Sequence, residues 1–405
     1  MKNLYFLLIT LLTFGLSQAQ IVNIPDANFK NALVNSNCVD IDGNGSGDID
    51  ADTNDDGEIQ VTEALAVLSL DVTSRSIVSL EGLQSFINLE NLFGGSNFIE
   101  NLDISQNLNL QTLSFYYNSL TSLDVSQNVS ISHLDISQNQ ITNINLYNLE
   151  NLLQLIIVNT PLETLDLSGN LNLELLYGRN NEFSNIDLSN NINLNYLECT
   201  DNQLTNLDVS QNINLTVLSC FNNNLIDLDL SQNHALESLH VTNNNITDLD
   251  LSDNSNLTYL YVIGNNLESL NIRNGNNQNI YQCVTTENPN LLCIEVDDIE
   301  IPSEQNGWFQ DPWTHYSLNC ELGIEENDLN FQVNVYPNPV KDILRIDTTN
   351  SLEINSVKIY DTLGRLLLTS KDNLDQTDIS FLNSGVLLVE LETTVGNLTQ
   401  KIIKE

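Results

Sequence analysis

The hexapeptide LDVSQN occupies residues 123–128 and returns unchanged at residues 207–212. Near-copies begin at positions 102, 165, 186, 228 and 249, each with aspartate in second place. The starting positions of any two copies differ by 21 or by a multiple of 21. A fixed period of this length predicts a solenoid, in which each unit buries its apolar side only by stacking on its neighbours.

The second position of the hexapeptide is almost always aspartate. The residues are Asp103, Asp124, Asp166, Asp187, Asp208, Asp229 and Asp250, with Asn145 and Asn271 in the two remaining units. One explanation is that the carboxylate accepts hydrogen bonds at a bend, and the other is a carboxylate column that binds cations. Carboxylates about 5 Å apart repel by roughly 0.8 kcal/mol in water. We favour the hydrogen-bonding explanation, because aspartate commonly bonds to nearby backbone at bends.

A second motif lies between the hexapeptides. The segment LQTLSFYYNSLTSL, residues 110–123, has the form LxxLxLxxNxLxxL. The sequence thus resembles the leucine-rich repeat family in its 21-residue bipartite form, over about nine units in residues 80–282. The resemblance implies a repeat solenoid, mostly β with turns. Its asparagines are expected to form an internal ladder at the bends, broken at Thr160: Asn97, Asn118, Asn139, Asn181, Asn202, Asn223, Asn244 and Asn265.

The outward positions of the two half-units behave differently. In the second half-unit they are nearly always Asp and Ser, whereas in the first half-unit they vary freely. Leucine-rich repeat proteins usually bind on the concave strand face, and exposed aromatics are good contact anchors. We therefore predict a protein or glycan ligand on this face, at Phe93, Tyr116, Tyr177, Arg179, Phe221 and Tyr261. The alternative is a structural surface-layer protein without a specific ligand.

The charge of the chain excludes some partners and the motifs argue against catalysis. The 405 residues include 12 Lys and Arg against 54 Asp and Glu, for a net charge of -42. So acidic a surface repels nucleic acid and anionic membranes. Only four histidines are present, and neither HExxH, GxSxG nor a P-loop occurs. We predict that the protein is not an enzyme.

The N-terminus indicates export. Residues 1–19 combine an early lysine, an apolar run and a small-residue ending, which predicts a secretory signal peptide. The apolar run is too short to span a bilayer, and no other segment comes close, so no transmembrane segment is expected. The product is expected to be secreted, either extracellular or attached to the outer-membrane surface.

Residues 20–79 are predicted to form a helical N-terminal cap with a calcium loop. The segment IPDANFKNALVNS favours a short helix with Asp26 as its N-cap. The segment DTNDDGEIQVTE, residues 52–63, matches the EF-hand calcium loop at every fixed position. Its predicted ligands are Asp52, Asn54, Asp56, the Glu58 carbonyl and bidentate Glu63. A possible second, incomplete site comprises Asp40, Asp42, Asn44 and Asp48. A truncated EF-hand ahead of leucine-rich repeats is similar to the internalin arrangement.

Six cysteines fit an oxidising compartment. Cys199 and Cys220, one repeat period apart, are interpreted as stacked core thiols rather than as a disulfide or metal pair. Cys293 and Cys320 are the predicted disulfide, and Cys38 and Cys283 remain unassigned. Residues 283–320 leave the 21-residue pattern and are predicted to cap the solenoid, with both tryptophans over the last turn.

Residues 321–332 form a predicted polar linker, after which the composition changes. Residues 333–405 hold seven of the twelve basic residues against ten acids, whereas residues 20–332 hold four bases and 44 acids. Strand-like segments predict a small antiparallel β-sandwich. The segment resembles the C-terminal sorting domain of the Bacteroidetes type IX secretion system, through YPNP at 336–339, LGR at 363–365, SGV at 384–386 and the terminal KIIKE. The resemblance implies the type IX secretion machinery as a partner.

Overall fold

The computed structural model describes residues 20–40, 47–304, 306–320, 333–348, 354–372, 374–393 and 396–405. The predicted signal peptide and linker lie outside these ranges. The chain forms two compact units that divide between Cys320 and Glu321. In the described ranges, no helix has both the length and the apolar character needed to cross a bilayer.

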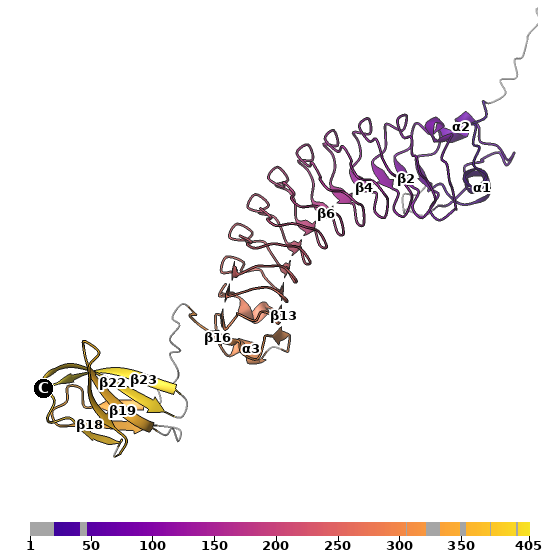
Figure 1. The fold of residues 1–405 in the computed structure, drawn as a ribbon. Coiled ribbons are helices and arrows are strands. Elements are labelled where there is room, and N and C mark those ends of the chain that lie inside the picture. The colour runs from indigo at the N-terminus through magenta and orange to yellow at the C-terminus, as the bar shows by residue number, and fades with distance from the viewer. Residues whose placement is uncertain are drawn as a thin grey trace, which may run out of the picture. The chain divides into compact units, whose positions relative to one another are not determined.

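The first unit is a solenoid whose turns stack side by side, from α1 and α2 at one end to β16 and α3 at the other (Figure 1). One strand from each turn joins a parallel sheet of twelve strands. They are β1 (Ser69–Asp71), β2 (Asn91–Phe93), β3 (Thr112–Ser114), β4 (His133–Asp135), β5 (Gln154–Ile156), β6 (Leu175–Tyr177), β7 (Tyr196–Glu198), β8 (Val217–Ser219), β9 (Ser238–His240), β11 (Tyr259–Tyr261), β13 (Gln282–Val284) and β15 (Trp308–Phe309).

The 21-residue period sets the register of this sheet. Leu92 pairs with Leu113, and Leu113 pairs with Leu134, so equivalent residues lie beside each other in successive turns. The central leucine of each strand from β1 to β11, and Cys283 in the same place in β13, are buried in one continuous core that runs from the N-terminal cap to Trp308. The predicted leucine-rich repeat solenoid is therefore confirmed.

The N-terminal end is closed by two short helices and a 3₁₀ turn. α1 (Ala27–Asn35) begins at Asp26, whose Oδ1 accepts the backbone N–H groups of Asn28 and Phe29 at 2.8 and 2.9 Å. Phe29 and Leu33 are fully buried, as the predicted helix requires. α2 (Val61–Ala64) has only four residues, and the turn η1 (Leu83–Ser85) follows.

The C-terminal end continues the solenoid further than the sequence predicted. A second parallel sheet, on the other half-unit, consists of β10 (Asp248–Asp250), β12 (Ser269–Asn271), β14 (Cys293–Glu295) and β16 (His315–Ser317). Strands β13 to β16 pair in order with the preceding turns, although their spacing exceeds the repeat period. The predicted cap, residues 283–320, thus consists of two longer solenoid turns and α3 (Ile301–Glu304), and η2 (Asn277–Asn279) precedes it.

Only one of the two tryptophans closes the core. Trp308 is buried, and its Nε1 donates to the Ile280 carbonyl at 2.9 Å. Trp313 is half exposed, and its Nε1 contacts the Asn288 carbonyl at 3.4 Å. The prediction that both rings cover the last turn is therefore wrong for Trp313.

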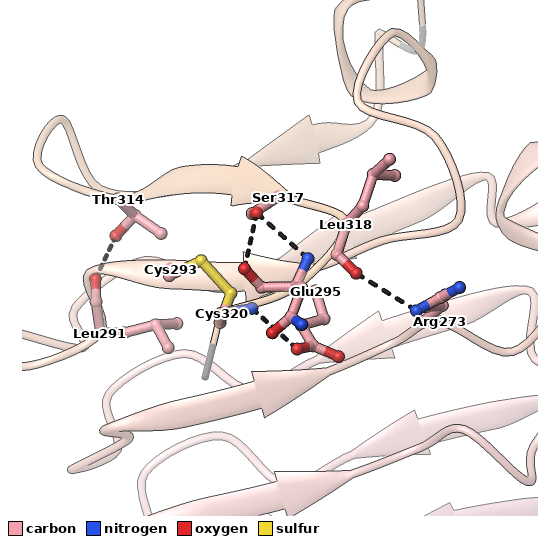
Figure 2. Close-up of a disulfide and its surroundings, with 9 residues drawn as sticks. Arg273, Leu291, Cys293, Glu295, Thr314, Ser317, Leu318 and Cys320 are labelled. Carbon is pink, nitrogen blue, oxygen red and sulfur yellow. Dashed lines mark hydrogen bonds between the residues drawn. A yellow bond between two sulfur atoms is a disulfide. The ribbon is translucent and has the colours of Figure 1, made fainter. Parts of the chain in front are cut away.

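Figure 2 shows that Cys293 and Cys320 form a disulfide, the pair that the sequence predicted. It joins β14 to the segment after β16, across a Cα–Cα distance of 5.8 Å. The Cys320 N–H donates to Glu295 Oε1 at 2.8 Å. The last turn is therefore held covalently as well as by strand pairing.

Two buried asparagine ladders run along the solenoid. The first is the predicted one, in which Asn223 Nδ2 donates to the Cys199 carbonyl at 3.0 Å and its Oδ1 accepts the Leu204 N–H at 3.0 Å. Thr160 interrupts it, as expected, with a buried hydroxyl that has no hydrogen-bond partner among the described residues. The second ladder is formed by the last residue of the hexapeptide: Asn107, Asn128, Asn170, Asn191, Asn212, Asn233 and Asn254. Its amide oxygens have no hydrogen-bond partner within the part of the chain that the structure describes.

The second unit has two antiparallel sheets around a core of its own. One sheet contains β17 (Val333–Tyr336), β18 (Ile343–Thr348) and β21 (Gln376–Asp378). The other contains β19 (Ile354–Asp361), β20 (Leu366–Ser370), β22 (Gly385–Thr393) and β23 (Gly396–Lys404). Both sheets contribute to the core, with Leu344 from the first and Ile359 from the second fully buried.

Candidate functional site

The candidate site is the outward face of the twelve-stranded sheet. Within each strand the central residue points into the core and its two neighbours point outward, as Leu113 does between Thr112 and Ser114. A third outward position follows two residues after each strand. The turns from β2 to β11 therefore carry three columns of side chains. We call this surface the sheet face.

Sequence reasoning missed the first of these columns. It begins at Asn91 and includes Tyr196 and Tyr259, which lie two residues before the second column. The period-2 rule that identified the second column also predicts this one, so the signal was present in the sequence.

Aromatic rings gather toward the C-terminal part of the sheet face. The Tyr177 and Tyr196 ring centroids lie 4.7 Å apart. The Phe221 ring stacks on His240 at 4.4 Å, and His240 lies 5.1 Å from Tyr261. We call these five residues the aromatic cluster. Three of the six predicted ligand residues, Tyr177, Phe221 and Tyr261, belong to it.

Arg179 completes the cluster but does not carry a free charge. Its guanidinium carbon lies 6.0 Å from the Phe221 ring centroid, within cation–π range. Its Nε donates to Asp201 Oδ2 at 3.2 Å, and both side chains are partly exposed. Asp201 adopts a left-handed conformation, with φ of 54°, and also accepts from Asn222 Nδ2 at 2.7 Å. The cluster is therefore close to neutral.

Burial alters two titratable groups in this region. Burial lowers the pKa of His240, so its imidazole is neutral at neutral pH. Burial also raises the pKa of Glu198, and the Arg179 charge partly offsets this shift. A neutral His240 adds no positive charge to the sheet face.

The other two predicted ligand residues lie at the N-terminal end of the face. Phe93 is half-buried at the end of β2, and the Tyr116 ring lies directly over Gly95. A side chain at Gly95 would place its Cβ 2.5 Å from that ring. Phe93 and Tyr116 are thus separated from the aromatic cluster by the turns that contain β4 and β5.

Those intervening turns form a shallow hollow of about 260 Å³. Its lining comes from β3, β4 and β5 and includes Ser114, His133, Asp135, Gln154 and Ile156. Burial raises the pKa of Asp135, although its carboxylate accepts the Ser137 N–H at 3.0 Å. The hollow is open and shallow, which suits a contact surface more than a reaction chamber.

The aspartates of the hexapeptide have the structural role that we favoured. Asp208 Oδ1 accepts the Ser210 N–H at 3.0 Å, and the same bond recurs at Asp103, Asp124, Asp166, Asp187, Asp229 and Asp250. Asn145 and Asn271 make the equivalent bond through their amide oxygens. Hydrogen bonds from the Ser210 backbone and hydroxyl hold the pKa of Asp208 below its usual value.

The predicted calcium loop is folded around its own backbone N–H groups. Asp52 Oδ2 accepts from Gly57 at 2.7 Å, and Asn54 Oδ1 accepts from Asp56 at 2.9 Å. Glu63 accepts the Thr53 N–H at 2.9 Å, which closes the loop on itself. Gly57 has a φ of 82°, the left-handed conformation that the sixth loop position needs.

The types of ligand atom and the loop conformation fit a calcium site, but the carboxylates are not close enough together to bind an ion. Two competing bonds run from Gln60 Nε2 to Asp56 Oδ1 and Oδ2, at 3.1 and 2.9 Å. Within the ranges described above, no group of three or more Asp, Glu, His or Cys lies close enough to hold a metal ion. Calcium binding would therefore require Asp56 to exchange Gln60 for the ion. The Glu58 side chain pairs with Lys30 of α1 at 2.6 Å, whereas its predicted ligand atom is the backbone carbonyl.

The remaining predicted residues are less informative. Asp42 and Asn44 of the possible second loop lie outside the described residues, while buried Asp40 and partly exposed Asp48 lie beside the bridge between Val39 and Ile49. Cys199 and Cys220 are free and buried on neighbouring turns, as expected for core thiols. Cys38 and Cys283 are also free and buried, and burial raises the pKa of each to about 12.

Comparison with known proteins identifies the second unit and supports the fold of the first. Residues 334–405 match the family described as the secretion system C-terminal sorting domain. An internalin, InlF, from Listeria monocytogenes is 19% identical, with a TM-score of 0.54 over 76% of this chain and 94% of that one. The functional domain of InlJ from the same organism is 21% identical, with a TM-score of 0.45 over 95% and 98% of the two chains. No curated protein sequence matches the chain.

These likenesses show a leucine-rich repeat fold followed by a secretion sorting domain. A sorting domain implies export, so the protein is a secreted or outer-surface leucine-rich repeat protein. The likeness to the internalin shows the fold alone.

Proposed function

We propose that this protein is an exported recognition protein that binds a protein partner on its sheet face. The observation that carries the proposal is the distribution of charge. The sheet face has 27 outward positions between residues 91 and 263, nine in each of its three columns. Only three of these positions hold a charged residue, namely Asp135, Arg179 and Glu198. Interface cores are depleted of charge and enriched in Tyr, Phe and Arg.

The aromatic cluster would be the centre of this interface. Its rings contact each other in two groups, and all of its residues except Phe221 lie on paired strands, so little side-chain freedom is left to lose on binding. Aromatic and arginine side chains supply most of the binding energy in many interfaces. Arg179, held by Asp201, adds a planar donor group beside Phe221.

The proposal is tested by protein and glycan arrays probed with the purified protein. The double variant Tyr177→Ala and Phe221→Ala should lose binding by at least tenfold, because it removes both parts of the cluster. The matched control is Tyr147→Ala, which removes an aromatic ring that is 59% exposed on the other half-unit. A protein hit that depends on the cluster supports the proposal.

Other outcomes of the arrays decide between the alternatives. A glycan hit that depends on the cluster would keep the sheet face as the site and replace the protein ligand. No cluster-dependent hit of either kind would favour the structural surface-layer protein without a specific ligand. Binding that maps to the Asp–Ser columns would show that the sheet face is the wrong surface.

We also propose that residues 333–405 act as a separable signal for the type IX secretion machinery and are removed or modified at the cell surface. The support is the family match at residues 334–405 and the division of the chain at Cys320. Deleting residues 333–405 should leave the protein in the periplasm. Normal surface delivery of the shortened chain would contradict this proposal.

We propose one calcium ion in the loop of residues 52–63, with a structural role. The support is the donor set and the loop closure by Glu63, which ties the loop to the start of α2. Calorimetry should give heat and a higher melting temperature on calcium addition, with an affinity on the order of 10⁻⁴ M, as in other extracellular modules. Glu63→Gln should abolish both effects, whereas Glu81→Gln, outside the loop, should not. No heat with the unaltered chain would mean that the loop is only a turn.

A further inference from the structure

A second repeated surface lies outside the sheet face. In the bend that precedes a strand of the long sheet, six turns each expose one aliphatic side chain, at positions that share the 21-residue period. These are Ile87, Leu108, Val129, Leu171, Ile192 and Ile213, which are 45, 51, 49, 53, 53 and 57% exposed. We call them the aliphatic stripe. Neighbouring strands of the sheet are paired, so members on neighbouring turns lie about 4.8 Å apart along the solenoid, whereas Val129 and Leu171 are two turns apart.

Four of the six members of the stripe are fixed by a third asparagine ladder. Asn109 Nδ2 donates to the Ile87 carbonyl at 3.1 Å, and Asn214 Nδ2 donates to the Ile192 carbonyl at 3.1 Å. Equivalent bonds reach the carbonyls of Val129 and Leu171. The aliphatic side chains are therefore presented on a fixed backbone, and a contact made there would cost little conformational entropy.

Uncharged side chains border the stripe on both sides. The residue after each member is asparagine or serine, and the residue two before it is Ser, Gln, Gly or Asn. Residues 20–332, which include this band, contain 44 acidic and four basic residues. Two copies of such a chain repel each other over most of their surface, but they can approach along a band in which Glu150 is the one charged side chain.

The order of residues along the stripe is symmetric. Three aliphatic positions precede Glu150, which occupies the middle turn and is exposed, and three follow it. A contact between identical surfaces has a two-fold axis, which requires each residue to meet its counterpart on the opposite side of the axis. A two-fold at Glu150 would bring Val129 against Leu171, and likewise for the outer pairs.

We propose that the aliphatic stripe is a self-association surface, along which two copies of this chain pack antiparallel about a two-fold axis at Glu150. The period of the stripe favours a second copy over other partners. The six stripe residues repeat with the spacing of the solenoid turns, so a partner that contacts all of them must have contact residues at the same spacing. Another copy of this chain has such residues. Each aliphatic pair removes from water two side chains that are about half exposed.

Glu150 is the one unfavourable residue in this arrangement. At the two-fold axis it would lie opposite the Glu150 of the partner copy, and two carboxylates repel each other. Glu150→Gln should therefore tighten the dimer several-fold. The effect should decrease with added salt, because ions screen an exposed pair.

The experiment is sedimentation velocity on the purified chain over a wide range of concentration. The unaltered chain should dimerise, and Leu108→Gln with Ile192→Gln should raise the dissociation constant at least tenfold. The matched control is Ile226→Gln, which replaces an isoleucine that is 64% exposed outside the stripe. Melting temperatures of the variants should match the unaltered chain, since all three sites are exposed.

A cross-linking variant tests the position of the axis. Under mild oxidation, Glu150→Cys should form a disulfide-linked dimer faster than Ile226→Cys. Among the cysteines that the structure describes, the four that are free are buried and should not compete. A chain that stays monomeric at all concentrations, or a dimer that the stripe variants leave unchanged, would overturn the proposal. Failure of Glu150→Cys to cross-link faster than the control would overturn the axis.

Discussion

The two buried asparagine ladders should differ in how much they stabilise the solenoid. Asn223 of the first ladder uses both ends of its amide, since its oxygen accepts the Leu204 N–H and its nitrogen donates to carbonyls. Asn212 of the second ladder donates to the carbonyls of Leu188 and Asn191, and its oxygen has no partner among the described residues. Replacing each with leucine, which has the same branching, isolates this difference.

The backbone groups left behind decide the result. In Asn223→Leu the Leu204 N–H is buried without an acceptor. In Asn212→Leu no group is stranded, because the Leu188 carbonyl still accepts the Asn191 N–H at 3.0 Å. The Asn191 carbonyl likewise still accepts the Leu194 N–H at 3.0 Å. The same variant also removes an amide oxygen that was buried without a partner in the described ranges.

The expected difference is about 2 kcal/mol, because a buried group left without a partner costs about 1–3 kcal/mol, and each lost hydrogen bond costs about 0.5–1.5 kcal/mol. We expect Asn223→Leu to lower the free energy of unfolding by about 3 kcal/mol and Asn212→Leu by about 1 kcal/mol. The larger volume of leucine affects both variants in the same way and cancels in the comparison.

Differential scanning calorimetry of the full chain measures both variants, provided that the transition of the solenoid is analysed apart from that of the sorting domain. Hydrogen exchange at the Leu204 amide adds a local readout, and only Asn223→Leu should accelerate it. Equal destabilisation by the two variants would refute the reasoning. It would mean that the Asn212 oxygen has a partner of its own, such as a buried water molecule.

Three further outcomes are expected. Asp208→Asn should change the free energy of unfolding by less than about 0.5 kcal/mol at neutral pH in thermal melts, because an amide oxygen can accept the same Ser210 N–H. Burial raises the pKa of Asp135 in the folded state. The protonated side chain therefore contributes stability at pH values below the unfolded pKa of about 4, and this stability is lost as the pH rises through the folded-state pKa. Asp135→Asn should therefore raise the melting temperature at neutral pH and have no such effect in acid. Breaking the bond between Cys293 and Cys320, which are 27 residues apart, should cost up to about 3.5 kcal/mol by loop entropy, and hydrogen exchange should rise first in β14 and β16.

The sequence predicted those features that depend on one repeat alone. The burial of Leu113, the bend at Asp208 and the ladder at Asn223 each follow from a position within the 21-residue unit. The disulfide was also predicted, because Cys293 and Cys320 bracket a single segment. In each case local chemistry and the period were sufficient.

Features that depend on contacts between repeat units of the solenoid were harder to predict. The pairing of Arg179 with Asp201 joins residues on neighbouring turns, and it depends on the left-handed conformation of Asp201. The pairing of β13 with β11 was missed because the interval between them is longer than the repeat period, which hides the repeat. The strand pairing persists because the extra residues lie between the strands, which keep their order.

The uniform register between turns also bears on how the gene can change length. β7 pairs with β8 in the same register as β8 pairs with β9. Recombination between two copies of the hexapeptide therefore adds or removes a whole turn and leaves an intact junction. A chain that lacks residues 187–207 should fold one turn shorter, with β6 against β8. Duplication of the same segment would lengthen the sheet face by one strand, so this architecture can extend its surface without having to build a new core.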